Sequence, residues 1–556
     1  FYHLRYRPVR GFVRWYNYTL IALANGDALL DRELDLVLLE FWHEQDPHNN
    51  EDQIRGLPRD IVRGTSLGRR VALAFAEERY QDAINEAHNI RAKHTEFAPD
   101  RERLTPSALD VWEARSLVYL GGADELQQAD NLLTGAIDAL ETYIAGLDID
   151  LADSTDDSAE YLYSWRAHAN LALAYGQRGY ANRIRNNLQA AVADYRHSAT
   201  IWHQLDVLVE LGTTQNNLGF AYNEQNLIDE ALDMVDNALA TRKQLAAWNA
   251  IGLTHNTRGL IEMFEGRYRD AMDHSNLALA IFRALDSRRG TGLALTALAE
   301  ITRRHSASNA VLAPERKIEL LHRSLHMAED ANLIFRESKE NVRRFAALVE
   351  VGCAYRDWIG IRVEHPDPRD DRQRLLQKAQ ISFEQALQLA NQSAVKRRQL
   401  EVLVNIVALG HVAQNNQLFE QSYRRAEEFI PDGYRIDPQL GRPSQSTDTA
   451  ENSFWPLVAT LHLLNGHHEM DQIDVSSDCL ASAAEQYTLC LQYNELFDDD
   501  FRDLRRATSE IHARLNQLSS HQLRMFTHAV LATEHDYHIG SSVLKERLKR
   551  RALWLE

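Results

Sequence analysis

The 556-residue sequence is short of glycine, proline and cysteine. Its 25 glycines and 12 prolines are together 37 of 556 residues, about 7%, against roughly 12% in average usage. Because these two residues interrupt helices, their scarcity favours a chain of long helices. The 3 cysteines do not suffice for a disulfide framework and suit a reducing compartment, so we expect a cytoplasmic location.

Long apolar runs and an excess of positive charge are also missing. No stretch approaches the ~18 uncharged apolar residues of a membrane helix, so we expect no membrane span. The 61 Lys and Arg against 80 Asp and Glu give a net charge of −19, which disfavours broad binding to a phosphate backbone. A hydrophobic content of 44% argues against wholesale disorder. The length exceeds a single core of ~250–300 residues, which leaves several domains or a repeat array.

A repeat of forty residues runs through the middle of the chain. Small residues return at fixed offsets, namely at Gly219, Ala231 and Ala238, then Gly259, Ala271 and Ala278, then Ala299, with further sets at Gly352, Ala379 and Ala386. Such residues let paired helices approach closely, and residues seven apart lie on one helix face. Each pair can bury only part of its apolar surface alone, so the pairs must stack. The pattern predicts an all-α array of antiparallel helix pairs.

These residues resemble the tetratricopeptide repeat (TPR) family over residues 66–493, most closely over 161–390. The period of forty exceeds the ~34 of the shortest repeats, and is similar to the longer-helix variety of kinesin light chains and bacterial signalling proteins. Glu262 and Ser275 depart from the family, because they stand where aromatic residues are usual. The resemblance implies a right-handed α-solenoid, a TPR-like superhelix.

Breaks in the pattern divide the chain into four regions. We predict an irregular helical connector or arm at 1–65, the repeat array at 66–430, a Pro- and Gly-rich loop at 431–452, and further helical pairs with a C-terminal cap at 453–556. Within the first region, an apolar helix is expected to end at Asp46-Pro47. Since the chain starts at Phe1 without a signal-peptide pattern, we expect it to be a piece of a longer protein.

The usual motifs of catalysis and cofactor binding are missing from the sequence. There is no GxxxxGK[ST] loop for a nucleotide and no GxSxG nucleophile turn. The run from His467 to Gln472 resembles a zinc motif, but Gln472 replaces its second ligand. His535 and His538 are more simply read as surface residues. We therefore predict no cofactor, no metal and no enzyme activity, although side chains that converge only in space could still form a hidden site.

The inner helices of such an array line a groove, and the repeat offsets predict which residues face it. The candidates are Asn216, Phe220, Asn223, Asn256, Leu260, Met263, Phe264, Arg303 and Arg356. Their amides could bond a peptide backbone, their apolar side chains could hold anchors, and their arginines could bind carboxylates. In the alternative interpretation, Phe220, Leu260 and Met263 belong to the core between helices, and Arg303 lies on a solvated face.

The chain also resembles the C-terminal sensor of bacterial signal-transduction ATPases with numerous domains (STAND). That resemblance implies that a protein, peptide or small-molecule inducer binds the groove and relieves autoinhibition of an upstream NTPase region. From the net charge and the missing apolar runs, we expect no membrane and no direct nucleic-acid partner. Two alternatives remain open: a constitutive scaffold or adaptor for protein assembly, or the repeat half of an effector protease. An enzyme with its active site in the groove is a further hypothesis.

Overall fold

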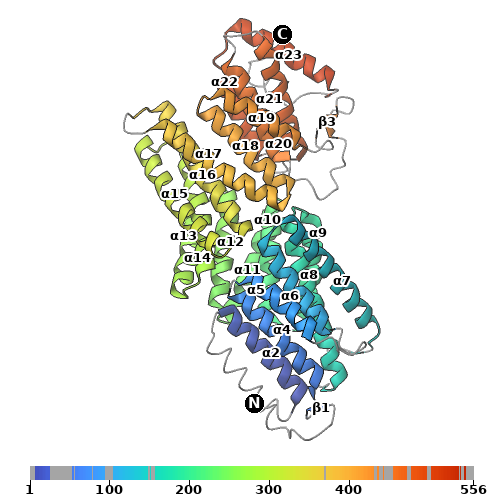
Figure 1. Ribbon diagram of the computed structural model, residues 1–556. Coiled ribbons are helices and arrows are strands. Elements are labelled where there is room, and N and C mark those ends of the chain that lie inside the picture. Colours follow the sequence, from blue (N-terminus) through green and yellow to red (C-terminus); the bar gives the residue numbers. More distant parts are fainter. Residues whose placement is uncertain are drawn as a thin grey trace. The chain divides into compact units, whose positions relative to one another are not determined.

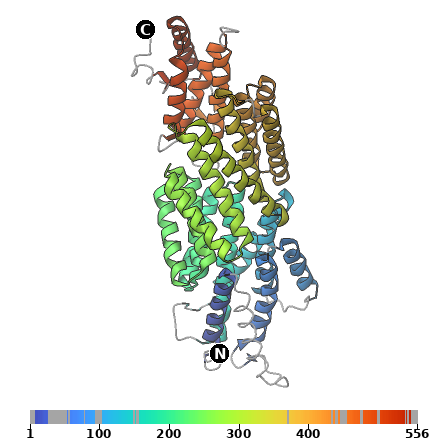
Figure 2. The same cartoon turned by 90° about the vertical axis from the view of Figure 1, so that its left-hand side faces the viewer.

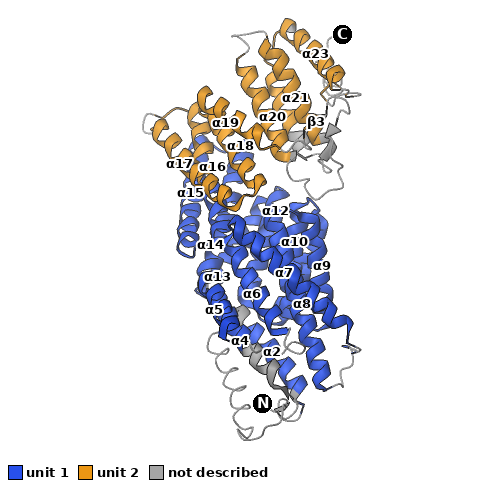
Figure 3. Ribbon diagram, turned by 45° about the vertical axis from the view of Figure 1, so that its right-hand side comes forward, with its two compact units in different colours: residues 1–350 blue, residues 351–556 orange. Residues whose placement is uncertain are grey.

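The computed structural model describes residues 7–25, 53–54, 57–77, 79–93, 104–147, 149, 151, 157–367, 371–430, 435–437, 442–443, 455–472, 478–497, 502–537, 539 and 544–545. The chain forms two compact units, unit 1 over residues 1–350 and unit 2 over residues 351–556 (Figure 3). The boundary falls within one helix, α16 (Asn341–Glu364).

The described part of unit 1 consists of helices, with one short antiparallel pair of strands, β1 (Gln53–Ile54) and β2 (Leu57–Pro58). Its first helices are α2 (Pro8–Asn25), α4 (Arg59–Ala76), α5 (Tyr80–Lys93), α6 (Leu104–Leu120) and α7 (Ala123–Ala145). They are followed by α8 (Ala159–Ile184), α9 (Leu188–Gln204), α10 (Leu208–Glu224), α11 (Ile228–Gln244), α12 (Trp248–Phe264), α13 (Tyr268–Ala284), α14 (Arg288–Ser308) and α15 (Pro314–Glu337).

The central helices follow a strict rhythm. Each of α10 to α13 has 17 residues and is followed by three residues before the next helix. One residue of each joint has a positive φ, at Asn226, Ala246, Gly266 and Asp286. At Asn226 the turn is closed by Leu227 N donating to Tyr222 O at 2.9 Å. This left-handed ending reverses the chain at once, so consecutive helices form antiparallel pairs.

Small residues lie where the helices cross, as the repeat predicts. A Cβ on Gly219 would lie 2.9 Å from the carbonyl oxygen of Ala231, and one on Gly259 would lie 2.9 Å from that of Ala271. Ala231 and Ala271 are themselves completely buried. The successive pairs α8/α9, α10/α11, α12/α13 and α14/α15 stack side by side (Figures 1 and 2). The prediction of an all-α solenoid is confirmed.

The first region contributes a helix to the packing of unit 1. α2 contacts α8, α10 and α12 of the repeats, and its Phe12 and Trp15 are buried. The sequence pattern did not indicate this position, because we interpreted residues 1–65 as a connector or arm. The apolar helix expected before Asp46-Pro47 lies outside the described residues.

Unit 2 continues with helices of the same kind. It holds the second half of α16, then α17 (Arg372–Ser393), α18 (Lys396–Val412), α19 (Asn416–Glu428), α20 (Trp455–Asp471), α21 (Asp478–Phe497), α22 (Arg502–Leu515) and α23 (Ser520–Asp536). A Cβ on Gly352 would collide with the ring of Phe383, so this predicted crossing is also tight. Toward the end of the chain, α20 to α23 share one core around Tyr487 and Phe526.

Two features of unit 2 bear on the predicted regions. Of the loop expected at residues 431–452, the described part is an antiparallel pair, β3 (Ile436–Asp437) with β4 (Arg442–Pro443), and residue 435. Tyr493 of α21 accepts a hydrogen bond from the Ile436 main chain at 3.1 Å, which ties this segment to the helices. Among the helices of both units that the structure describes, none has the length and apolar character that crossing a membrane would require.

Candidate functional site

The inner face of unit 1 is lined by the first helices of successive pairs, α8, α10, α12 and α14. Besides its outer partner, α10 contacts α8 and α12, and α12 contacts α14. Helices on the concave side of a curved stack come closest to one another, so these contacts place the four helices on the inside. The sequence offsets predicted this same set of helices.

Four asparagines on this face form what we call the asparagine ladder: Asn216 and Asn223 on α10, and Asn249 and Asn256 on α12. The members on each helix are seven residues apart, two turns along one face. Asn216, Asn223 and Asn256 are each 8% exposed. The side-chain oxygen of all four is buried and accepts no hydrogen bond within the described chain.

An unpaired buried acceptor is unfavourable by about 1–3 kcal/mol, and native proteins hold few of them. The four oxygens, on the neighbouring faces of α10 and α12, therefore need hydrogen-bond donors from outside the described chain, either water or a bound molecule. Asn249 was missed by the sequence reasoning. The signal was present, since Asn249 precedes Asn256 by seven residues as Asn216 precedes Asn223.

Two predicted aromatic residues keep part of their surface in solvent. Phe220 is half-buried, with the Arg183 guanidinium 4.5 Å from its ring centre. Phe264 is 40% exposed, with the Arg304 guanidinium 5.2 Å from its ring centre. These two rings offer apolar surface with cations stacked on it, which suits an aromatic or apolar side chain of a ligand.

The alternative interpretation holds for Met263. Its side chain is 2% exposed and packs with Ala271 and Ile301 between helices. We had assigned Met263 to the groove, and its burial in the core corrects that assignment. Leu260 is half-buried and packs against the same cluster, so part of its side chain belongs to the core and part stays exposed.

The two predicted arginines are engaged within the chain. Arg303 is buried and forms a two-pronged ion pair with Glu350, at 2.8 and 3.1 Å; it is neither a solvated residue nor a free anion site. Arg356 belongs to unit 2, where it donates to Asp357 at 2.9 Å and to Asn405 at 2.6 Å. Arg303 lies on α14, which contacts α12.

The N-terminal helix α2 covers part of the inner face. The Arg10 main chain donates to Asp157 at 3.0 Å, just before α8, and the Arg10 side chain donates to Tyr161 at 2.8 Å. Further along α2, the Tyr16 ring packs edge-on against the Trp165 ring, with 5.3 Å between the ring centres. These contacts lie near the start of α8, whereas Asn216, Asn223 and Asn256 lie in the middle and at the end of α10 and α12.

A histidine pair joins α12 to α13. His255 Nδ1 lies 3.0 Å from His274 Nδ1, and His274 Nε2 lies 3.6 Å from buried Glu262. Burial, together with the positive charges of His274, Lys243 and Arg258, lowers the pKa of His255 to about 4. His255 is therefore neutral near pH 7.

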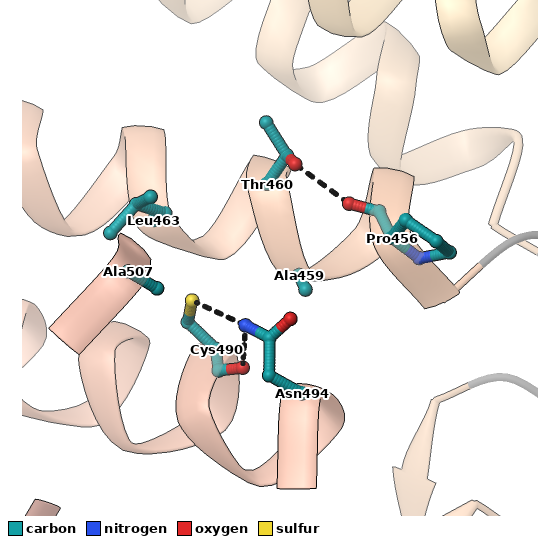
Figure 4. A pocket seen from close by; sticks show the side chains of 7 residues that line it. All are labelled: Pro456, Ala459, Thr460, Leu463, Cys490, Asn494 and Ala507. Atoms are coloured by element: carbon teal, nitrogen blue, oxygen red, sulfur yellow. Dashed lines mark hydrogen bonds between the residues drawn. The ribbon is translucent and has the colours of Figure 1, made fainter. Parts of the chain in front are cut away.

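The described residues do not bring together three His, Cys, Asp or Glu side chains that could hold a metal ion. The suspected His467 shares a hydrogen bond with Tyr487 at 2.8 Å, and His538 lies outside the described residues. In unit 2, a cavity of ≈ 10 Å³ beside Cys490 and Asn494 has room for one water molecule rather than a substrate (Figure 4).

Comparisons with known proteins find similar solved structures but no family. No family model matches the chain, and neither does any curated protein. Among solved structures, the chain is similar to a Rap protein complexed with competence and sporulation factor, with 11% identity, a TM-score of 0.47, and coverage of 79% of this chain and 99% of that one. The apo form of RapI matches at 10% identity and a TM-score of 0.43 over 79% of this chain and 99% of that one. A circular tandem repeat protein matches at 11% identity and a TM-score of 0.19 over 94% and 98%.

Proposed function

We propose that unit 1 is a partner-binding module that takes up an extended peptide segment on its inner face. The asparagine ladder is the observation that carries this proposal. A side-chain amide can accept a hydrogen bond from a peptide N–H and donate one to a peptide C=O. An extended segment offers both groups at every residue, so its N–H groups can donate to the four ladder oxygens.

The spacing of the ladder fits an extended chain. Seven residues along a helix rise about 10.5 Å, and neighbouring helices pack about 8–10 Å apart. Each residue of an extended peptide advances about 3.3 Å. Neighbouring ladder asparagines therefore contact peptide residues about three apart, whether the peptide runs along a helix or across from one helix to the next.

Phe220, Leu260 and Phe264 provide the sequence preference. Their partly exposed apolar surface adjoins the ladder on the same two helices. Main-chain bonds to the amides give affinity for any extended segment, whereas these side chains favour apolar residues between the bonded positions. We expect a partner segment that alternates backbone contacts with one or two apolar anchors.

The module would act as a sensor if binding changed the position of α2. That helix occupies the start of the inner face, so a partner that extends from the ladder toward α8 competes with it. In a longer protein, this competition would relieve autoinhibition of an NTPase region. A constitutive scaffold, whether for protein assembly or attached to an effector protease, would bind its partner without moving α2. The distance between a label on α2 and a label on α9, measured with and without peptide, distinguishes the sensor from the scaffold.

A selection from random twelve-residue peptides, displayed and captured by the full chain, tests the binding. Peptides enriched by the native chain should be lost with the double variant Asn216→Ala and Asn256→Ala. They should be retained by the matched control, Asn237→Ala and Asn276→Ala, which changes exposed residues of α11 and α13. Equal enrichment by both double variants, or none by the native chain, would refute the proposal.

A further inference from the structure

Helices of unit 1 that are far apart in the stack meet at their ends. Gly121, between α6 and α7, packs against Val342 in the first turn of α16, where a Cβ on Gly121 would lie 2.6 Å from a Val342 methyl carbon. Arg343, the next residue, donates through Nη2 to the hydroxyl of Tyr180 on α8 at 3.2 Å. Arg343 and Tyr180 are 163 residues apart, and α10, α12 and α14 lie between their helices in the sequence.

Aromatic rings and a second arginine extend this contact. The rings of Tyr119, at the end of α6, and Tyr180 lie 5.5 Å apart between their centres. Arg289, at the start of α14, has its guanidinium 5.0 Å from the Tyr119 ring centre and is held by buried Glu340 at 3.0 and 3.1 Å. The starts of α14 and α16 are thereby attached to the ends of α6 and α8. We call the following six residues the closing contact: Tyr119, Gly121, Tyr180, Arg289, Val342 and Arg343.

A contact of this kind is unusual in a stack of helix pairs. Each pair normally touches only its neighbours, so the curvature of the stack is the sum of small rotations along it. The closing contact joins pairs that are not neighbours, and therefore constrains the curvature of unit 1 directly. Since α6, α8, α10, α12 and α14 contact one another in succession, the contact of Arg289 on α14 with Tyr119 on α6 completes a ring of helices. The asparagine ladder lies on two members of this ring.

The closing contact is small. In the described part of the chain, α6 and α8 do not pack along their lengths against α14 or α16, so helix ends hold the ring closed. Its polar groups are also incompletely paired, because Arg343 Nε is buried without a hydrogen-bond acceptor and lies 3.6 Å from the Glu340 carboxylate. A buried donor without a partner is unfavourable, and opening would expose it to water. Small contacts of this kind open at a lower free energy than whole helices unfold.

We propose that the closing contact is a clasp, which opens to admit a partner segment to the inner face and closes again when the segment lies on the ladder. A closed ring admits a chain only end-first, whereas an open one also admits a segment from the middle of a partner chain. The inference rests on the proposed function for the nature of the partner. The opening itself is measured without one.

Thiol labelling of the full chain measures the opening. Val342→Cys places a thiol in the clasp, where the native side chain is 7% exposed, and native Cys353, 3% exposed and further along α16, serves as the internal reference. Each labelling rate is followed by mass spectrometry of the individual peptides and is divided by the rate of the same thiol in urea. The thiol at position 342 should react about tenfold or more faster than Cys353.

Tyr180→Phe distinguishes opening of the clasp from fraying of the first turn of α16. This substitution removes only the hydroxyl that accepts from Arg343, on another helix. Combined with Val342→Cys, it should speed labelling at position 342 further and leave Cys353 unchanged. The matched control Tyr268→Phe, which alters a half-buried tyrosine of α13, should change neither rate. Equal rates at the two thiols, or no response to Tyr180→Phe, would overturn the clasp.

A cross-link tests whether the clasp controls access to the inner face. Gly122 and Asn341 adjoin the residues that touch, so a bifunctional maleimide can join the two thiols of the variant Gly122→Cys with Asn341→Cys. Cross-linking before a peptide from the selection is added should slow its association about tenfold or more, and cross-linking after it has bound should slow its dissociation likewise. The single variant Gly122→Cys, treated with the same reagent, controls for the modification itself.

The two experiments separate the clasp from the proposed function. If peptides associate and dissociate at rates that the cross-link does not change, the clasp is refuted while the proposed function stands. If no peptide binds, the proposed function fails, and the labelling rates still decide whether the closing contact opens.

Discussion

Replacing glycine by alanine at two helical positions should have opposite effects on stability. At Gly259, the added Cβ would lie 2.9 Å from the Ala271 carbonyl oxygen and would also collide with the Ser275 hydroxyl. The hydroxyl can rotate, but the carbonyl belongs to the backbone of α13 and cannot move alone. At Gly135, in the middle of α7, an added Cβ meets nothing within 4 Å.

The magnitudes follow from two opposing effects. Overpacking a tight contact costs about 1–3 kcal/mol, whereas alanine is favoured over glycine in a helix by about 1 kcal/mol. Gly259→Ala should therefore lower the free energy of unfolding by about 1–2 kcal/mol, and Gly135→Ala should raise it by about 1 kcal/mol.

Urea unfolding followed by circular dichroism at the helix band measures both variants against the native chain. Near-ultraviolet spectra in the absence of urea establish that the native packing is retained. If Gly259→Ala stabilises the chain as much as Gly135→Ala does, α12 and α13 do not cross as closely as described. The packing argument for the repeat would then be wrong.

Three further substitutions test other contacts. Ala246→Gly should stabilise the chain by about 0.5–1 kcal/mol in urea unfolding, because Ala246 has a φ of 49° where the next joint has Gly266; a loss of stability would contradict this. His255 has its pKa lowered to about 4, so below the usual pKa of about 6.5 the unfolded chain binds more protons than the folded one. The free energy of unfolding should fall as the pH drops from 6.5 toward 4. His255→Gln should reduce the slope of this fall by the equivalent of up to one bound proton. An unchanged slope would show that His255 does not contribute to it. Glu340→Ala removes the partner of Arg289, bonded at 3.0 and 3.1 Å, and should cost about 3 kcal/mol; adding Arg289→Met should restore part of the loss, and an additive double variant would show that the pair is not coupled.

The repeat fold could be predicted because its physical requirement is local and strict. A crossing as close as that of Gly219 with Ala231 admits only small residues, and the same crossing returns every forty residues. The sequence therefore carries its signature at fixed offsets. The offsets also placed Asn216, Asn223 and Asn256 together on the inner helices.

The remaining features depend on contacts that no offset encodes. The pairing of Arg303 with Glu350 joins residues 47 apart, and the burial of Met263 depends on where Ile301 of α14 lies. The contacts of α2 with α8, α10 and α12 likewise join segments that are far apart in the sequence. Single-sequence patterns do not encode such contacts, so the position of α2 became visible only in the structure.

Hydrogen exchange of the full chain, with and without a peptide enriched in the selection, tests the central claim most directly. Binding on the inner face predicts slower exchange in α10 and α12, with the exposed outer helices α11 and α13 unchanged over the same times. Protection confined to outer helices or to unit 2, with α10 and α12 unaffected by a bound peptide, would contradict the account.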